Sequence, residues 1–273
     1  WYDSSVLCWA TCSTLPEPDV DEELFFGACR DRGIPIRLLR WDDPDDMPSP
    51  DEIVLIRSTW NYPWHVNEFR DWIRRTSLIC QMANPSHILL QNLDKRYLSD
   101  LDVPIVPTEF ITRGEEFDLP TEGKFVLKPT VGAGSFRTKV FESPSEDAVN
   151  FANTILIDSD LMIQPFMDSV HTVGEQSLVF IDGEFTHKII KTPRFEGSEE
   201  KVSEALPLGT RDLEFGNRTI RALKSQLIYA RVDVMELDGE WVLSELELTE
   251  PSLFLKQSRP ALERLVDWAA RIT

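Results

Sequence analysis

The sequence predicts an α/β chain whose C-terminal part changes to α+β, and three observations indicate this. Residues 5–57 alternate between short apolar runs and a helical stretch, as parallel sheets with crossover helices do. Beyond Pro104 and Pro107, short strands follow one another between glycine turns, a pattern typical of antiparallel sheets. With 273 residues, 42% of them apolar, the chain can bury one large core or several smaller ones.

The N-terminal region is expected to form a parallel sheet with helices. Its first apolar run, Ser5–Ala10, is too short to span a bilayer and lacks a basic flank, so we expect a buried strand there and not a signal or an anchor. Asn92 is expected to cap the third helix, with Asp94 in its first turn. The expected strands are Val6–Thr11, Ile34–Leu39 and Ile53–Arg57, and the expected helices are Asp19–Arg32, Asn67–Ile79 and Leu93–Leu101.

Strands dominate the rest of the chain. The acidic stretch Gly197–Glu204 is expected to be a mobile loop, because it is polar and lies between two regular elements. The expected strands are Lys124–Pro129, Phe136–Glu142, Leu161–Phe166, Gln176–Ile181, Glu184–Lys191, Tyr229–Leu237 and Trp241–Leu248. Helices are expected at Ser145–Ile155 and Arg259–Arg271.

Charge and cysteine content narrow the function classes. Forty-seven acidic and 28 basic residues give a net charge of −19, which repels nucleic acid and anionic membranes. Phosphate groups would therefore need a small pocket with local cations and backbone N–H groups. The four cysteines, Cys8, Cys12, Cys29 and Cys80, form no CxxC pair and suit a reduced cytoplasmic protein with neither zinc nor disulfides.

Acidic side chains gather on the last two predicted strands. Asp233 lies on one of them, and Glu245 and Glu247 lie on the next. A two-residue turn would send Asp233 and Glu245 to opposite sides of the sheet. We therefore predict a three-residue loop with Gly239 in the left-handed conformation, which gathers the carboxylates as an oxygen cage for Mg²⁺ beside Arg231. The alternative is a solvated, charged face of the sheet.

A lysine and a glycine-rich loop suggest a phosphate site. Lys128 ends the apolar strand before the loop, where an ammonium is costly unless it meets an anion, and the loop can present several N–H groups to the same anion. The loop comprises Gly132, Ala133, Gly134 and Ser135, and it matches neither the Walker A nor the GxGxxG pattern. An ordinary hairpin loop beside a snorkelling lysine remains the alternative.

Two further segments could bind a nucleotide and a carboxylic acid, respectively. A proline-containing hinge comprises Gln164, Phe166 and Met167. Its backbone groups could form hydrogen bonds with adenine, and its apolar side chains could contact the ring. The alternative is an ordinary core strand. Glu175 follows the hinge and could accept hydrogen bonds from ribose hydroxyls. In the loop after the third strand, Arg57 has a fork suited to a carboxylate, with Ser58 and Thr59 beside it.

Taken in chain order, these segments resemble the ATP-grasp superfamily from about Asn92 to Leu255. The resemblance implies that Lys95, in Asn92-Leu93-Asp94-Lys95, and Lys128 hold ATP phosphates. It matches Arg231-Val232-Asp233 and Glu245-Leu246-Glu247 to the family's arginine and metal-binding acids, although Glu247 stands where Asn is common. The motif from Arg57 to Trp60 and the run from Glu245 to Phe254 resemble the glutathione-synthetase-like branch, which includes the cyclo-ligase acting on O-ureido-serine. Asn61 stands where that group has an aspartate, so the substrate cannot be carried over.

The resemblance implies an ATP-grasp architecture in three parts: an N-terminal domain over residues 1–91, a central lid subdomain over 92–166 and a C-terminal metal-binding domain over 167–273. It also implies an ADP-forming ligase that moves a phosphoryl group from ATP to an amino-acid-like carboxylate, using two Mg²⁺ ions or Mn²⁺ in their place. Arg231 and Lys191 would stabilise the developing charge before an amine displaces phosphate. Small-molecule substrates are the expected partners, and a homodimer, cyclisation and joining of two molecules all stay open.

Two other functions stay open from the residues alone. A regulatory module that binds ATP without turnover would explain the extra carboxylate at Glu247. A two-carboxylate hydrolase would work without ATP.

Overall fold

The N-terminal sheet is parallel throughout, as predicted. The computed structural model describes residues 5–192 and 201–273. In spatial order the sheet contains β2 (Ile36–Arg40), β1 (Val6–Thr11), β3 (Glu52–Ser58) and β4 (Gln81–Met82). Because β1 and β3 are central, every residue of β3 is buried, and the loop after β3 is directed toward the C-terminal half of the chain.

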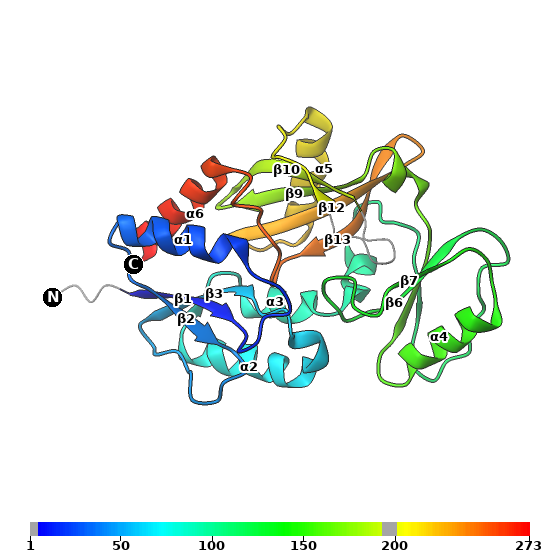
Figure 1. The fold of residues 1–273 in the computed structure, drawn as a ribbon, viewed down its shortest axis with the longest axis horizontal. Helices are drawn as coiled ribbons and strands as arrows, with labels where there is room; N and C mark the ends of the chain where they lie inside the picture. Colours follow the sequence, from blue (N-terminus) through cyan, green and yellow to red (C-terminus); the bar gives the residue numbers. More distant parts are fainter. Residues whose placement is uncertain (1–4, 193–200) are drawn as a thin grey trace.

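Helices cover both faces of this sheet (Figure 1). On one face, α1 (Val20–Asp31) lies beside α6 (Arg259–Ile272), and Trp9 and Phe25 join the core between them and the sheet. On the other face, α2 (Val66–Ile79) and α3 (Ser86–Asn92) pack through Phe69 and Trp72. The C-terminal helix thus returns to the N-terminal sheet, which joins the two ends of the chain into one core.

The lid subdomain is a small antiparallel sheet with a helix and a core of its own. Its strands are β5 (Glu109–Ile111), β8 (Leu161–Pro165), β6 (Phe125–Pro129) and β7 (Lys139–Phe141), in that spatial order. The helix α4 (Glu146–Leu156) begins after Ser145, whose hydroxyl caps the Ala148 N–H, and packs on β6 and β8. In Figure 1 this unit projects from one end of the molecule.

The third sheet is antiparallel and carries the acidic strands. Its spatial order is β11 (Lys201–Val202), β10 (Glu184–Thr192), β9 (Glu175–Ile181), β12 (Tyr229–Leu237) and β13 (Glu240–Glu247). The helix α5 (Thr210–Ala222) covers one face, and α6 covers part of the other. No helix among residues 5–192 and 201–273 has the length and apolar character needed to cross a bilayer.

The edge of β13 is covered by a short backbone bridge at Leu243 and, beyond it, by side chains. The amide of Asn92 donates to the Leu246 carbonyl and accepts from the Leu248 N–H, at 2.7 and 2.8 Å. The Tyr97 hydroxyl bonds to both backbone groups of Leu246, at 2.8 and 2.9 Å. These bonds satisfy the edge and connect the segment before the lid subdomain to the acidic hairpin.

Three local expectations are corrected. The expected helix at Leu93–Leu101 is a 3₁₀ segment, Lys95–Asp100, capped by Asp94, because the Asn92 amide is occupied by β13. The expected strand Phe136–Glu142 shortens to β7, because the glycine loop before it includes left-handed residues that no ladder accommodates. Within Gly197–Glu204, residues 197–200 lie outside the described part, whereas Lys201–Val202 form β11 and pair with β10.

Candidate functional site

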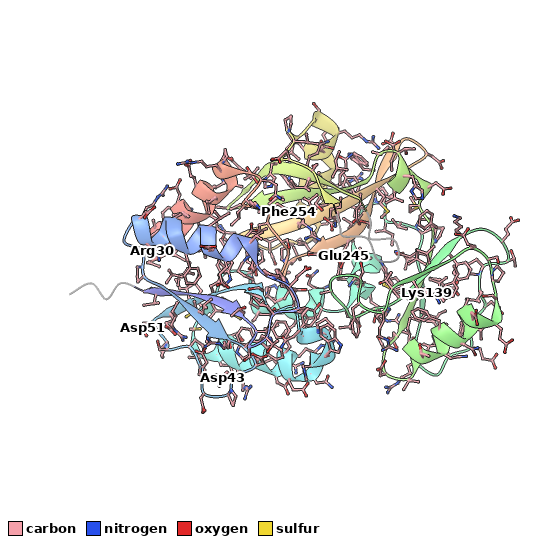
Figure 2. The ribbon with its side chains drawn as sticks, viewed as in Figure 1. Arg30, Asp43, Asp51, Lys139, Glu245 and Phe254 are labelled. Atoms are coloured by element: carbon pink, nitrogen blue, oxygen red, sulfur yellow. The ribbon has the colours of Figure 1, made fainter. Side chains whose placement is uncertain are left out.

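A cavity of about 640 Å³ opens between the lid subdomain, the C-terminal sheet and loops of the N-terminal sheet. Figure 2 labels Glu245 on the sheet side and Lys139 on the lid side of it. A larger groove of about 970 Å³ lies on the outer surface of the lid subdomain and contains none of the predicted site residues. The predicted residues that border the cavity are Lys95, Lys128, Gly132, Ala133, Gly134, Ser135, Gln164, Phe166, Met167, Glu175, Lys191, Arg231, Glu245 and Glu247.

The hairpin of β12 and β13 brings the acidic residues to one face, but not through the predicted loop. Its turn has two residues, Asp238 and Gly239, with φ of 51° and 82°, as a type I′ turn requires. The predicted three-residue loop is therefore wrong. A β-bulge at Ser244 supplies the odd residue instead and shifts the register, so that Asp233 lies opposite Glu245 and Arg231 opposite Glu247.

The bulged residue also ties three strands together. The Ser244 hydroxyl lies 2.8 Å from Glu175 Oε1 on β9 and 3.0 Å from the Asp233 carbonyl on β12. Ser244 is buried and borders the cavity. A regular ladder would have placed Ser244 opposite Asp233 and turned Glu245 to the other side of the sheet.

Asp233 is buried behind the cavity wall and is held by two cations. Lys191 Nζ and Arg231 Nη2 each lie 2.8 Å from Asp233 Oδ2, and Arg231 Nε donates to Oδ1 at 2.9 Å. Burial alone would raise the pKa of this carboxyl, but the charges of Arg231 and Lys191 outweigh burial and hold the pKa far below its usual range. Lys191 also pairs with Glu175 at 2.8 Å, so it joins β9 to β12.

The other two acids border the cavity, each beside a cation. Lys95 Nζ lies 3.1 Å from Glu245 Oε1 and also contacts the Gly132 carbonyl. Arg231 pairs with Glu247. Burial raises the pKa of Glu247 to about 8, because Arg231 only partly compensates for burial. Burial would also raise the pKa of Glu245, yet Lys95 and Lys128 lower it.

The carboxylates do not form the predicted oxygen cage. Among the residues that the structure describes, no group of three or more acidic, His or Cys side chains has a metal-site arrangement. Each of these three carboxylates lies beside a cation instead. The donor chemistry still fits Mg²⁺, since Glu245 and Glu247 present oxygens to the cavity with Asp233 beside them on the same face.

On the lid side, Lys128 and the glycine loop form the facing wall. Burial lowers the pKa of Lys128, and the nearby charge of Glu245 partly offsets this effect. Gly134 and Ser135 have φ of 56° and 62°, so consecutive residues adopt the left-handed conformation typical of anion-binding backbone. A side chain at Gly132 would place its Cβ 3.3 Å from Phe136 Cβ, so the loop leaves little room for a side chain there.

The hinge borders the same cavity, with part of its hydrogen bonding already used. The Phe166 N–H donates to the Lys124 carbonyl at 2.9 Å, so this N–H is engaged within the lid subdomain. Gln164 donates to Thr108 Oγ1 at 2.7 Å. Phe166 and Met167 border the cavity as an apolar seat, and Glu175 is engaged by Lys191.

Arg57, Ser58 and Thr59 do not border the cavity, contrary to their predicted contact with substrate. The Arg57 guanidinium lies between the rings of Trp9 and Tyr229, 5.5 and 5.4 Å from their centroids. It donates to the Pro251 carbonyl at 2.5 Å. Since β3 is a central strand, its end is covered by residues 249–252, which encloses these side chains.

Sequence reasoning missed several residues that border the cavity. Trp60 and Trp64 follow β3, Lys139 opens β7, and Glu250 lies three residues after Glu247. A third glutamate shortly after Glu245 and Glu247 was a usable signal. The bulge at Ser244 had none, because nothing in a serine distinguishes a bulged position from a paired one.

Three comparisons place the chain among known proteins. A family model for the N-terminal domain of D-cycloserine synthetase DcsG matches residues 7–84. The cycloserine biosynthesis protein DcsG of Streptomyces lavendulae is 30% identical over 274 residues, which cover 87% of this chain and 88% of that protein. The crystal structure of D-cycloserine synthetase DcsG superposes with a TM-score of 0.88 at 28% identity, over 98% of this chain and all of that one.

The fold extends to more distant ligases. D-alanine–D-alanine ligase from Bacillus anthracis, complexed with ATP, superposes with a TM-score of 0.70 at 16% identity, over 98% of this chain and 97% of that one. At this identity the similarity concerns the fold alone.

Proposed function

Since the chain belongs to the DcsG family of ATP-grasp ligases and is an ATP-dependent, ADP-forming carboxylate–amine ligase, we propose that the cavity between the lid subdomain and the C-terminal sheet is where it activates an amino-acid-like carboxylate. One observation carries this proposal. The register of the β12–β13 hairpin puts Arg231, Asp233, Glu245 and Glu247 on a single face, and Lys128 and the glycine loop border the same cavity.

ATP would bind with its base at the hinge and its phosphates between Lys128 and the glycine loop. Phe166 and Met167 provide the apolar seat for adenine, and Glu175 is close enough to the hinge to accept from ribose once Lys191 turns to the phosphates. Lys95 and Lys128 border the cavity together with the loop. Lys95 already contacts the Gly132 carbonyl, so it would fix both the loop and a phosphate oxygen.

Glu245, Glu247 and Asp233 would hold magnesium. We propose two ions, with Mn²⁺ able to replace them, because two carboxylates border the cavity and a third lies beside them on the same face. When bound, the ions would neutralise negative charge on the phosphates. Arg231 and Lys191 would then be drawn from the carboxylates toward the transferring phosphoryl group.

The reaction would follow from this arrangement. The substrate carboxylate attacks the γ-phosphorus, the bond to the β-phosphate oxygen breaks, and ADP and an acyl phosphate result. An amine then attacks the acyl carbon and phosphate leaves. The protein supplies position and charge without a covalent step of its own. Whether the amine belongs to the same molecule decides between cyclisation and joining.

We further propose the division of the chain at residues 91–92 and 166–167, supported by the fact that each sheet falls within one segment. Small molecules would be its partners, with neither nucleic acid nor membrane, as the net charge of −19 favours. The free thiols of Cys8, Cys12, Cys29 and Cys80 support a reducing, cytoplasmic setting. A homodimer is compatible with this proposal.

The test is ADP release with Mg·ATP across amino acids, ureido acids and hydroxy acids, with hydroxylamine added to trap an acyl phosphate as the hydroxamate. We expect one class of acid to stimulate both ADP and hydroxamate formation. Mg·ATP that raises the unfolding temperature while no acid stimulates release would contradict the proposal and favour a binding module.

A further inference from the structure

One end of the cavity is lined by residues that the proposed ATP contacts do not use. Trp60 and Trp64 come from the loop after β3, and Glu250, Ser252 and Phe254 come from the loop after β13. This end is formed where the N-terminal sheet meets the C-terminal sheet. It is therefore the place where a second, non-nucleotide molecule would meet the γ-phosphate.

Glu250 is the charged group of that end. Its side chain is only 9% exposed, and its carboxylate accepts a hydrogen bond from the Tyr62 hydroxyl. Within the described residues, no Lys, Arg or His nitrogen lies within 4 Å of this carboxylate, whereas Glu175, Glu245 and Glu247 each pair with a cation. A buried carboxylate beside a cavity, without an ion-pair partner among residues 5–192 and 201–273, calls for a cation from outside.

The backbone around Glu250 is fixed from three directions. The Trp60 indole donates to the Glu250 carbonyl at 3.1 Å, and Arg57 donates to the next carbonyl, that of Pro251. The Tyr229 hydroxyl donates to the preceding carbonyl, that of Thr249, at 2.9 Å. Three consecutive carbonyls are thus held by buried donors, which makes the carboxylate a pre-organised group rather than a mobile one.

We propose that Glu250 binds the ammonium group of the acid substrate, and that Tyr62 positions it. This inference rests on the proposed function and assigns the residue that distinguishes a carboxylic acid carrying a primary ammonium group from a hydroxy acid of the same shape. One end of the substrate meets Lys128 and the metal-binding acids, and the other meets Glu250. A carboxylate retains several lone pairs after one accepts from Tyr62, so the ammonium can be bound directly.

The burial of Glu250 supports the same proposal. It raises the pKa of Glu250 to about 7, although the charge of Lys95 and the hydrogen bond from Tyr62 both lower it. An ammonium beside the carboxylate would favour the ionised form.

The test compares matched pairs of acids: D- and L-alanine against D- and L-lactate, and D- and L-serine against D- and L-glycerate. For the wild-type protein we expect the kcat/KM of substrate-dependent ADP release to favour the ammonium member by about 50-fold or more, since a site built for a charged group rejects an analogue without it. Glu250→Gln keeps the size and the hydrogen bond to Tyr62 but removes the charge. It should raise KM for the amino acid by about 100-fold, leave kcat within about threefold, and abolish the preference.

Two variants complete the experiment. Tyr62→Phe should raise KM by about fivefold with kcat nearly unchanged, because it loosens Glu250 without removing its charge. Glu263→Gln, on the exposed side of α6, is the matched control and should leave both constants unchanged. If Glu250→Gln unfolds at a much lower temperature, the Tyr62→Phe result decides whether the inference holds.

Three outcomes would overturn the inference. Wild-type protein that uses lactate or glycerate as well as the amino acid has no ammonium site. A Glu250→Gln protein that keeps the preference places the site elsewhere, while the ligase activity itself stands. Absence of ADP release by the wild type with every acid contradicts the proposed function, and this inference falls with it.

Discussion

At the scale of single residues, burial decides what each cation near the cavity can do. Lys128 borders the cavity, and burial lowers its pKa, so an anion from outside would meet an ammonium that has already lost most of its water. Arg57 is 2% exposed and enclosed by two aromatic rings and a carbonyl, so it holds protein rather than ligand. Two residues with equal formal charge therefore differ in position: Arg57 supports the fold, and Lys128 borders the cavity where a ligand can reach it.

Lys128→Met should weaken Mg·ATP binding by about 30-fold, because it removes a charge-assisted contact worth about 2 kcal/mol while keeping the length of the side chain. The rise in unfolding temperature with added Mg·ATP measures this. Lys256→Met, at an exposed position, is the control. An unchanged rise for Lys128→Met would remove Lys128 from the nucleotide site.

Arg57→Met should lower the free energy of unfolding by about 3 kcal/mol, because the change removes a buried hydrogen bond and two cation–π contacts. Urea unfolding measures the loss. Arg74→Met, on the exposed side of α2, should cost less than about 0.5 kcal/mol. Unchanged stability together with a raised KM for the acid would instead restore the predicted contact of Arg57 with substrate.

His187→Gln should reduce the loss of folding stability at acid pH. His187 is 3% exposed, and burial lowers its pKa from 6.5 to about 4. Below about pH 6.5 the unfolded chain binds a proton that the folded protein refuses, so stability falls as the pH drops, by about 2 kcal/mol at pH 5. Unfolding temperatures at about pH 7 and about pH 5 measure the difference, with exposed His87→Gln as the control. An equal decrease in all three proteins would contradict the assignment.

At the scale of elements, the β12–β13 hairpin combines two irregularities that together create the site. The two-residue turn would place Glu245 on the wrong face, and the bulge at Ser244 reverses this. Each irregularity has a local cause: positive φ at Asp238 and Gly239, and the contact of Ser244 with Glu175 on the next strand but one. The acidic constellation thus depends on a register that neither strand determines alone.

Gly239→Val should lower the free energy of unfolding by about 2 kcal/mol, because a β-branched residue is strained at a φ of 82°. The matched control is Glu240→Val, which places the same side chain on the adjacent exposed residue of β13, where strand propensity favours it. Urea unfolding of both variants tests the turn. An equal loss in both would mean that the turn imposes no strain.

At the scale of the whole molecule, three sheets meet at the cavity, and shared apolar cores and polar contacts join them. The Trp64 ring lies edge-on to Phe136 of the glycine loop, with centroids 5.1 Å apart, and this contact links the N-terminal sheet to the lid subdomain. On the opposite side, Asn92 and Tyr97 tie the start of the lid subdomain to β13. The lid subdomain has a core of its own, and Met162 of β8 also packs in the core of the C-terminal sheet.

Trp64→Ala should free the glycine loop, because it removes an aromatic pair worth about 1 kcal/mol. We expect faster hydrogen exchange of the amides at 132–138 and a KM for ATP raised by about fivefold. Leu78→Ala, another exposed apolar side chain, is the control. Unchanged exchange at 132–138 would show that Trp64 does not restrain the loop.

The predictions from sequence succeeded where a local pattern carries the information. The parallel and antiparallel halves and most strands follow from periodicity and glycine positions, and most of the predicted site residues border the cavity. The predictions failed where the local structure depends on a contact with a residue far away in the sequence. Asn92 looks like a helix cap until β13 is placed beside it, and the end of β3 looks like an open loop until residues 249–252 cover it.

The sequence by itself determined which chemical groups the protein possesses and which segments carry them, because side-chain type and strand periodicity are written residue by residue. Only the tertiary structure decided which of these groups share one face and one cavity. The bulge at Ser244, the enclosure of Arg57 and the placement of Glu250 each depend on contacts between residues far apart in the chain. Register and burial are properties of the packed whole, and no window of sequence contains them.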